Sequence, residues 1–352
     1  MTVVMKKSAP AARRFAATAL AVGLAGAAVA GCSDMPNTTA DDNVEEMGDA
    51  SPAPSPKDAH PAGDVIDFGD ITDIEAAGEY IAVRTPDTLT IGSPADFKAK
   101  KATAIDVDTQ CGDLTPTDTE FVLACGNRVR IFDAADPTQE RMVNTEEAYP
   151  VTAAALTSSG ELFVSSHEAS EVAVYKDDKR IDDFSVQAPT DQLVAVRNQD
   201  DTDNVVRVWR ADTTIQNLDW ENSREGGRLR VGQGVGLISS GNHGVLVAAD
   251  TEGKRVAIYT SEDVIRLHQF GNTDGMPWAT AWDDSRQLAW VTTTDNNKAQ
   301  AFRIASGVPE SQGQVDTVAD AQHMAVTEDG IAVFGSATGA GLQIVSDPKP
   351  DA

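Results

Sequence analysis

The chain of 352 residues carries 55 acidic side chains against 28 basic ones, which gives a formal net charge of −27 at pH 7. A surface this negative repels phosphate backbones and anionic lipid headgroups, so the composition argues against nucleic acid as a partner. Hydrophobic residues make up 41% of the chain. The folded part, roughly residues 64–347, is large for one ordinary core but normal for a closed β architecture.

The N-terminal segment has the three parts of an export signal. Basic residues between Lys6 and Arg14 precede an apolar run over residues 15–30, which is too short and too rich in small residues for a permanent transmembrane helix. The run ends in Val29-Ala30-Gly31-Cys32, which resembles the lipobox of bacterial lipoproteins. We expect a lipoprotein signal peptide over residues 1–31 and a lipid anchor on Cys32, which would hold the protein at the extracytoplasmic face of the cell membrane. An ordinary signal peptide that happens to contain this cysteine is the alternative.

The segment after Cys32 has the composition of a tether. It is rich in Asp, Glu, Pro, Ala, Ser and Thr, and it contains a Ser-Pro-Ala-Pro-Ser-Pro run at residues 51–56. Such a segment buries too little apolar surface to offset the entropy of ordering it. The sequence therefore predicts a lipidated cysteine and a disordered, acidic, Pro-rich tether over residues 32–63.

Seven units of near-constant length follow the tether. Each unit contains one strand that is more hydrophobic than the rest, and the residues directly before these strands are Glu79, Glu120, Glu161, Asn204, Gly244, Gln287 and Gly330. Their successive spacings are 41, 41, 43, 40, 43 and 43 residues. Most units hold four strands, because runs rich in Val, Ile and aromatic residues alternate with turns of Asp, Gly, Ser and Asn. A unit of about 40 residues with four strands is the blade of a β-propeller.

The two ends of the repeat predict how the ring closes. The seventh unit stops after residues 341–345 with one strand too few, while residues 65–68 form a spare strand before the first unit. That strand can supply the missing outer edge of blade seven and so remove an exposed edge. We expect an all-β fold, a seven-bladed β-propeller over residues 64–348 closed by an N-terminal outer strand, with a disordered tail at 349–352. A two-sheet sandwich, the alternative for short strands, would not repeat seven times.

Two cysteines remain beside Cys32. In the oxidising compartment that the export signal predicts, Cys111 and Cys125 are expected to form a disulfide, since no further ligands at short spacing favour a metal site. The first would open the innermost strand of blade two and the second would end the next strand. A hairpin centred near Asp118 would place them face to face, and closing this loop contributes roughly 3 kcal/mol.

The third unit carries a family resemblance. Residues 160–175 begin Gly-Glu-Leu-Phe-Val-Ser-Ser and end Glu-Val-Ala-Val-Tyr, and this pattern resembles the repeats of YVTN/NHL-type propellers. With the lipobox and the acidic tether, the whole chain resembles actinobacterial envelope lipoproteins of the LppL kind. The resemblance implies a propeller fold and an envelope location, and it implies no particular chemistry. Blade four departs furthest from the pattern, with Arg207 and Trp209 in its apolar strand.

Loops at one mouth of the central channel are the expected place for a ligand, because loops on a rigid scaffold carry function. The loops that lead into the inner strands, together with those between second and third strands, give a candidate ligand-binding mouth of Tyr149, His167, Glu168, Asp191, Gln233, Trp278 and His323. Further loop positions are Arg84, Asn127, Asp250 and Asn296. This polar and aromatic mixture suits a polar small molecule, a glycan or a peptide.

Recognised catalytic motifs are missing from the sequence. A metal-dependent lactonase needs several carboxylates around one cation such as calcium, and the candidates, Glu168 and Asp191 among them, are scattered over the blades. A lyase needs a histidine base beside a carboxylate, for which His167 with Glu168, or His323, are candidates. We therefore expect a binding or scaffold module without a metal or other cofactor, which presents one mouth to an envelope protein, peptide or glycan. The alternative is a propeller enzyme, a metal-assisted hydrolase or a lyase, with its site at the same mouth.

Overall fold

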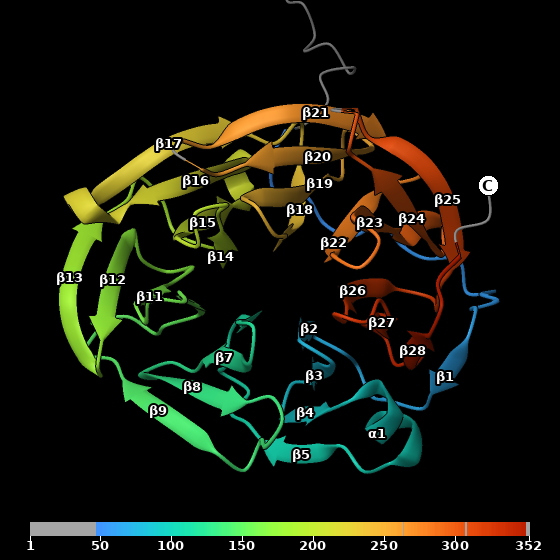
Figure 1. Cartoon of the computed structure of the whole chain (residues 1–352), viewed down its shortest axis with the longest axis horizontal. Helices are drawn as coiled ribbons and strands as arrows, with labels where there is room; N and C mark the ends of the chain where they lie inside the picture. Colours follow the sequence, from blue (N-terminus) through green and yellow to red (C-terminus); the bar gives the residue numbers. More distant parts are fainter. Residues whose placement is uncertain (1–46, 263, 307, 350–352) are drawn as a thin grey trace, which may run out of the picture. The chain divides into compact units, whose positions relative to one another are not determined.

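The arrangement of strands is seen in a computed structural model that describes residues 47–262, 264–306 and 308–349. Seven antiparallel sheets of four strands each stand around a central channel and close a ring (Figure 1). In each blade the strand nearest the channel pairs only with the second strand, and the fourth strand lies at the outside. The predicted seven-bladed β-propeller is confirmed. The predicted signal peptide, Cys32 and the first part of the predicted tether lie outside the described residues.

Blades one to six are each a run of four consecutive strands. Blades one and two consist of β2 (Asp73–Ala77), β3 (Tyr80–Arg84), β4 (Thr88–Gly92), β5 (Thr103–Asp106), and β6 (Leu114–Pro116), β7 (Glu120–Ala124), β8 (Arg128–Asp133), β9 (Glu140–Asn144). Blades three and four consist of β10 (Ala153–Leu156), β11 (Leu162–Ser165), β12 (Glu171–Lys176), β13 (Lys179–Ser185), and β14 (Gln192–Arg197), β15 (Asp203–Trp209), β16 (Thr214–Asp219), β17 (Arg224–Arg230). Blades five and six consist of β18 (Val235–Ser240), β19 (Val245–Asp250), β20 (Arg255–Thr260), β21 (Arg266–Asn272), and β22 (Pro277–Asp283), β23 (Leu288–Thr293), β24 (Lys298–Arg303), β25 (Glu310–Asp316).

Blade seven joins the two ends of the repeat. Its strands are β26 (Ala321–Val326), β27 (Ala332–Ser336), β28 (Leu342–Val345) and, as the outer strand, β1 (Asp64–Ile66). β1 runs antiparallel to β28, with Val65 opposite Gln343. The predicted closure is confirmed, although the strand begins one residue earlier and ends two residues earlier than the sequence suggested.

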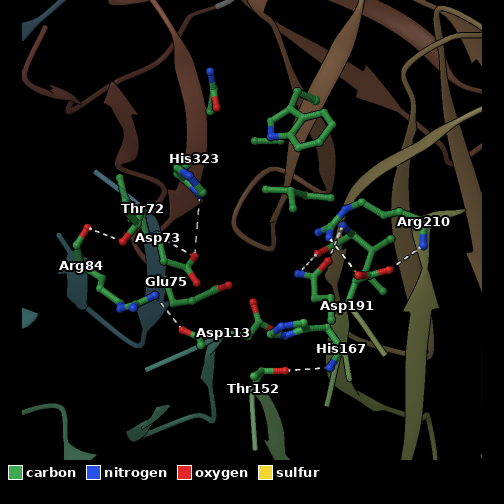
Figure 2. Close-up of a pocket in the computed structure, with 18 of the residues that line it drawn as sticks. Thr72, Asp73, Glu75, Arg84, Asp113, Thr152, His167, Asp191, Arg210 and His323 are labelled. Carbon is green, nitrogen blue, oxygen red and sulfur yellow. Dashed lines mark hydrogen bonds and ion pairs between the residues drawn. The ribbon is translucent and has the colours of Figure 1, made fainter. Parts of the chain in front are cut away.

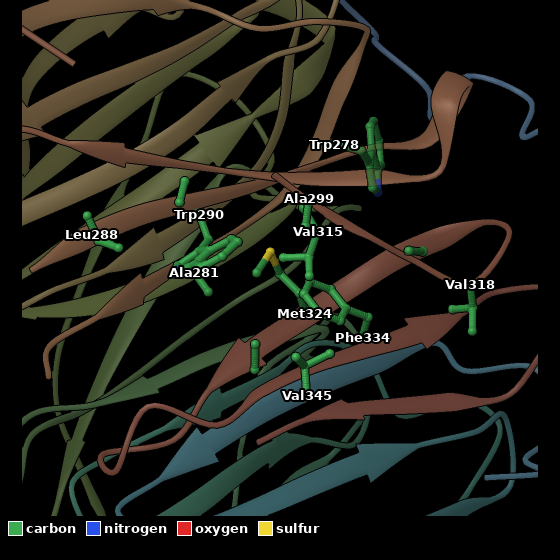
Figure 3. Close-up of a cluster of buried hydrophobic side chains, with 14 of the residues drawn as sticks. Trp278, Ala281, Leu288, Trp290, Ala299, Val315, Val318, Met324, Phe334 and Val345 are labelled. Carbon is green, nitrogen blue, oxygen red and sulfur yellow. The ribbon is translucent and has the colours of Figure 1, made fainter. Parts of the chain in front are cut away.

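The hydrophobic core is divided among the interfaces between neighbouring blades. β10 and β11 are buried along their whole length, whereas the outer β13 is mostly exposed. One interface cluster joins blades six and seven through Trp290, Phe334 and Met324 (Figure 3). Burying a side chain of this size contributes about 1.5–3 kcal/mol, so each blade is stabilised mainly by its two neighbours.

The predicted disulfide between Cys111 and Cys125 is present. The two cysteines flank the hairpin of β6 and β7, in which Leu114 lies opposite Leu123. The described residues contain one α-helix, α1 (Pro94–Ala99), and three short 3₁₀ turns at Arg210–Asp212, Trp220–Asn222 and Thr294–Asn296. No helix in this part of the chain is long and apolar enough to cross a membrane.

The end of the predicted tether lies on the ring. We call residues 47–56 the strap. The main-chain N–H of Gly48 donates to the carbonyl of Gln233 at 2.8 Å, and the Ser55 hydroxyl donates to the carbonyl of Thr294 at 2.6 Å. The sequence argument expected this stretch to be mobile because it carries few apolar residues. It is held instead through its polar main-chain and hydroxyl groups, which composition does not register.

Candidate functional site

The channel opens at two mouths. We call the one where the inner strands begin the front mouth and the one where they end the rear mouth. The front mouth is a cavity of about 920 Å³, lined by the first residues of the inner strands and by neighbouring loops (Figure 2). The rear mouth holds a cavity of about 580 Å³.

Five of the seven predicted mouth residues line the front mouth: His167, Glu168, Asp191, Trp278 and His323. They come from blades three, four, six and seven, so the ring brings side chains from distant parts of the chain into one cavity. His167 and Glu168 lie on the loop after β11, Asp191 lies just before β14, and the other two belong to inner strands.

Two predicted residues lie outside the cavity. Tyr149 is half-buried in the loop before β10, and its hydroxyl has no hydrogen-bond partner within the described residues. Gln233 lies beneath the strap, because its carbonyl accepts the N–H of Gly48. Of the further loop positions, Arg84 lines the cavity. The other three do not: Asn127, Asp250 and Asn296.

Three carboxylates from blades one and two line the front mouth: Asp73, Glu75 and Asp113. Successive side chains of a strand point to opposite faces, so Asp73 and Glu75 on β2 both face the channel. Ile74 between them is 2% exposed and packs into the core. Two residues of one strand therefore place two negative charges on the same wall.

The main chain around Asp113 is fixed on both sides. Cys111 is tied to Cys125 by the disulfide, and the Asp113 N–H donates to the carbonyl of Thr152 at 2.8 Å. A Cβ atom on Gly112 would lie 2.0 Å from that carbonyl oxygen, so only glycine lets the two blades approach this closely. Asp113 is thereby held in the cavity, and its Oδ2 atom has no hydrogen-bond partner within the described residues.

Burial makes these three carboxylates hard to ionise. It raises the pKa of Asp73 from 3.8 to about 6, although the N–H groups of Leu114 and Ile74, at 3.0 and 2.9 Å, favour the ionised form. Burial raises the pKa of Glu75 well above its usual value, and the charges of Asp73 and Asp113 raise it further. Burial followed by repulsion from Asp73 acts in the same way on the pKa of Asp113. Like charges in a poorly solvated site produce such shifts.

The two arginines of the cavity do not form ion pairs with this cluster. Within the described part of the chain, no Lys or Arg nitrogen lies within 4.0 Å of a carboxylate oxygen of the three. Arg84 donates to the main-chain carbonyls of Cys111 and Gly112. A guanidinium nitrogen of Arg210 lies 3.9 Å from a carboxylate oxygen of Asp191. The guanidinium carbon of Arg210 lies 6.0 Å from the centre of the Trp278 ring. The negative charge of the cluster therefore has no basic partner in direct contact.

The histidines of the cavity are neutral or solvated. Nδ1 of His323 lies 3.9 Å from Oδ1 of Asp73 and has no hydrogen-bond partner within the described residues. Burial, and then the charges of Arg210 and Arg84, lower the pKa of His323 to about 4, so its ring is uncharged near neutral pH. His167 and Glu168 lie 3.7 Å apart, and both are more than half exposed. Across residues 47–262, 264–306 and 308–349, no three His, Cys, Asp or Glu side chains are arranged to hold a metal ion.

Sequence reasoning missed Asp73, Glu75, Asp113 and Arg210. It searched the loops, whereas the carboxylates lie on or directly before the inner strands of blades one and two. A signal was present, because Asp73-Ile74-Glu75 alternates acidic and apolar residues on the strand nearest the channel. Acidic residues at positions i and i+2 of a strand lie on the same face, and burying two carboxylates in the apolar core is costly, so the channel is the face to expect.

Comparison with known proteins supports the fold. No family model matches the chain, and no curated protein matches its sequence. The structure is similar to a chain of a mitotic checkpoint complex, with a TM-score of 0.61 and 13% identity over 95% of this chain and 99% of that one. It is similar to the WD40 β-propeller domain of Doa1, with a TM-score of 0.60 and 12% identity over 83% and 97%. Hydrazine synthase of Kuenenia stuttgartiensis gives a TM-score of 0.61 and 10% identity over 81% and 98%. The protein is thus a seven-bladed β-propeller with WD40-like structural neighbours.

Proposed function

We propose that this protein is a membrane-anchored extracytoplasmic binding module, and that its front mouth binds a polar ligand carrying an ammonium or guanidinium group. The lipobox at Cys32 supports the anchor and the location. The observation that carries the ligand class is the cluster of Asp73, Glu75 and Asp113, which has no basic partner in direct contact. A propeller by itself is compatible with binding, scaffolding or catalysis, so the argument rests on this cavity.

A ligand cation supplies what the cluster lacks. The three carboxylates repel one another and are poorly solvated, so ionising them costs free energy in the empty protein. An ammonium group placed among them can donate three charge-assisted hydrogen bonds to the carboxylate oxygens and reduces the repulsion between the carboxylates. The cavity of about 920 Å³ has the size of sites that enclose small organic ligands. A lysine or arginine side chain of a peptide belongs to the same chemical class.

The proposal is tested by calorimetric titration of the full chain with benzylammonium and with its uncharged counterpart, benzyl alcohol. At about pH 8 we expect benzylammonium to bind about tenfold more tightly or better, since a hydrogen bond to a charged group is worth about 1.5–3 kcal/mol. The preference should shrink at about pH 5, because the carboxylates are then protonated.

Two variants separate the cluster from the general acidity of the chain. Glu75→Gln removes one charge from the front mouth and should lower the affinity for benzylammonium about tenfold. Glu328→Gln removes an exposed charge at the rear mouth and should leave that affinity unchanged. Equal binding of the two probes by the unmodified chain, or equal losses in the two variants, would refute the proposed ligand class.

A further inference from the structure

The strap is bound to the ring through specific polar contacts along the front mouth. The N–H groups of Gly48 and Asp49 donate to the carbonyls of Gln233 and Arg210, both at 2.8 Å. Arg210 directly follows β15 of blade four, and Gln233 lies just before β18, the first strand of blade five. The first residues of the strap therefore bridge blades four and five.

Ser55 fastens the other end of the strap between blades six and seven. Its hydroxyl donates to the carbonyl of Thr294 at 2.6 Å and accepts the N–H of Asp320 at 2.8 Å. The side-chain amide of Asn297 donates to the carbonyl of Pro56 at 2.8 Å. The strap is therefore fixed at two ends, with residues 50–54 between the fixed points.

Small residues are required where the strap meets the ring. Gly48 has a φ of +99°, and a Cβ atom there would lie 2.4 Å from the carbonyl oxygen of Ala211. Ala50 is 7% exposed and packs in the same cluster as Trp278. The fit is close, yet it involves methyl groups and glycine, which bury little apolar area.

The middle of the strap lies beside the aromatic wall of the front mouth. Ala50, Ser51 and Pro52 line the cavity together with Trp278, which is 9% exposed and shares a buried cluster with Ala50. Asp73 and Glu75 lie on blade one and Trp278 on blade six (Figure 2 labels the carboxylates). A ligand ring that reaches the buried part of Trp278 from the side of Ala50 has to displace the strap.

We propose that the strap is a gate of the front mouth, which opens to expose Trp278 to the ring of a bound amine. The proposal rests on the ligand class proposed above and adds a second, gated half to that site. Release is local, because the strap is held by a few hydrogen bonds and two buried alanines, Ala50 and Ala53. Regions with few buried apolar contacts open without unfolding of the whole domain.

A covalent lock tests the gate directly. A Cβ atom on Gly234 would lie 3.0 Å from the Ala50 Cβ, so a small shift allows a disulfide in an Ala50→Cys/Gly234→Cys chain once the Glu252 side chain moves aside. The matched control is Ala50→Ser/Gly234→Ser, which has similar atoms and cannot form the link. Both full chains are titrated with benzylammonium and with methylammonium, which carries the same charge without a ring.

The gate predicts that the lock weakens benzylammonium binding about tenfold or more relative to the serine control, and leaves methylammonium binding unchanged. Equal benzylammonium affinities in locked and control chains would show that the strap is a fixed wall, and would overturn the proposal.

A second measurement does not depend on any ligand. In the full chain with Ala50→Cys alone, the thiol at position 50 is buried while the strap is closed, and its reaction with N-ethylmaleimide is followed by peptide mass spectrometry. We expect labelling far faster than global unfolding, accelerated about tenfold by Ser55→Ala, which removes two hydrogen bonds. Ser51→Ala is the matched control, because Ser51 is exposed and has no side-chain hydrogen bond in the described chain.

The two measurements separate the gate from the proposed ligand class. If neither amine binds any variant, the ligand class fails, and the gate is then judged by labelling alone. Labelling of position 50 only at the rate of global unfolding would overturn the gate, whatever the amines do.

Discussion

The two mouths of the channel are lined by the same type of residue in different electrostatic states. At the rear mouth, Arg197 lies 2.7 Å from Asp203 and 3.4 Å from Asp118, and the second of these carboxylates is 82% exposed. At the front mouth, Asp73 and Glu75 face a deep cavity without a basic side chain in contact. These rear carboxylates are paired with Arg197 or solvated, whereas Asp73 and Glu75 at the front mouth are hard to ionise and have no basic side chain in direct contact.

This difference distinguishes a structural acidic surface from a binding site. In a chain with a net charge of −27, acidic side chains are common on the surface, so an acidic mouth alone does not identify a site. Burial together with the lack of a partner is the informative combination, because each ionised group then costs free energy that the fold does not recover. Groups kept at such a cost are typical of functional sites.

The largest expected effect comes from removing the disulfide that holds one side of the front mouth. In a Cys111→Ala/Cys125→Ala chain, a cross-link between residues separated by 14 positions is lost. We expect the free energy of unfolding to fall by about 3 kcal/mol in urea titrations. Affinity for benzylammonium should fall as well, because Asp113 follows Cys111 closely and Arg84 donates to the carbonyl of that cysteine.

The absence of either effect, on stability or on benzylammonium affinity, would contradict this role of the disulfide. A variant with unchanged stability would show that the blade-two hairpin is held by its strand pairing alone. A variant that is destabilised but binds benzylammonium as before would show that the disulfide does not position Asp113.

A smaller effect is expected when one charge is removed from the front mouth. Burial and the neighbouring carboxylates raise the pKa of Glu75 well above 4.5, so its ionised form is disfavoured only in the folded state. The resulting loss of stability is absent below the ordinary pKa and grows as the pH rises through the raised one. Glu75→Gln should therefore raise the midpoint of thermal unfolding of the empty protein at about pH 8, and have little effect on it at about pH 4.

The rear mouth provides the matched control for that measurement. Glu328 is exposed at the rear mouth, so Glu328→Gln should leave the unfolding midpoint nearly unchanged at both pH values. If Glu75→Gln destabilised the protein at the higher pH, or if its effect did not depend on pH, Glu75 would not carry the unfavourable charge that we assign to it.

The fold could be predicted from the sequence because the ring repeats one pattern seven times. Spacings of 40–43 residues between hydrophobic strands, such as those after Glu79 and Glu120, required no knowledge of distant contacts. The closing strand was predictable too, since blade seven lacked a strand and residues 65–68 supplied one. The docking of the strap was not, because it depends on carbonyl groups of the ring that become available only after the ring has formed.

The candidate site could be predicted only in part. Positions such as His167, on a loop, and Trp278, at the start of an inner strand, followed from the blade plan, and the structure places both in the front mouth. Tyr149 fits the same plan but lies elsewhere, because the blade plan locates a loop and does not fix the direction of each side chain. Asp113 was missed because its unfavourable charge arises where the neighbouring blades one and two meet, and no single repeat contains that information. Asp73 could have been found from the alternation of acidic and apolar residues on its own strand.

The central claim is that the front-mouth carboxylates have no basic side chain in direct contact and are therefore hard to ionise, and carbon-13 NMR of the Asp and Glu carboxyl groups tests it most directly. We expect the carboxyl of Asp73 to titrate near pH 6 in the empty protein and that of Glu75 to titrate well above its usual range. Both pKa values should fall when benzylammonium is bound, because a cation favours the ionised forms. Ordinary pKa values for both groups in the empty protein would mean that the cluster is already neutralised, and would contradict the account.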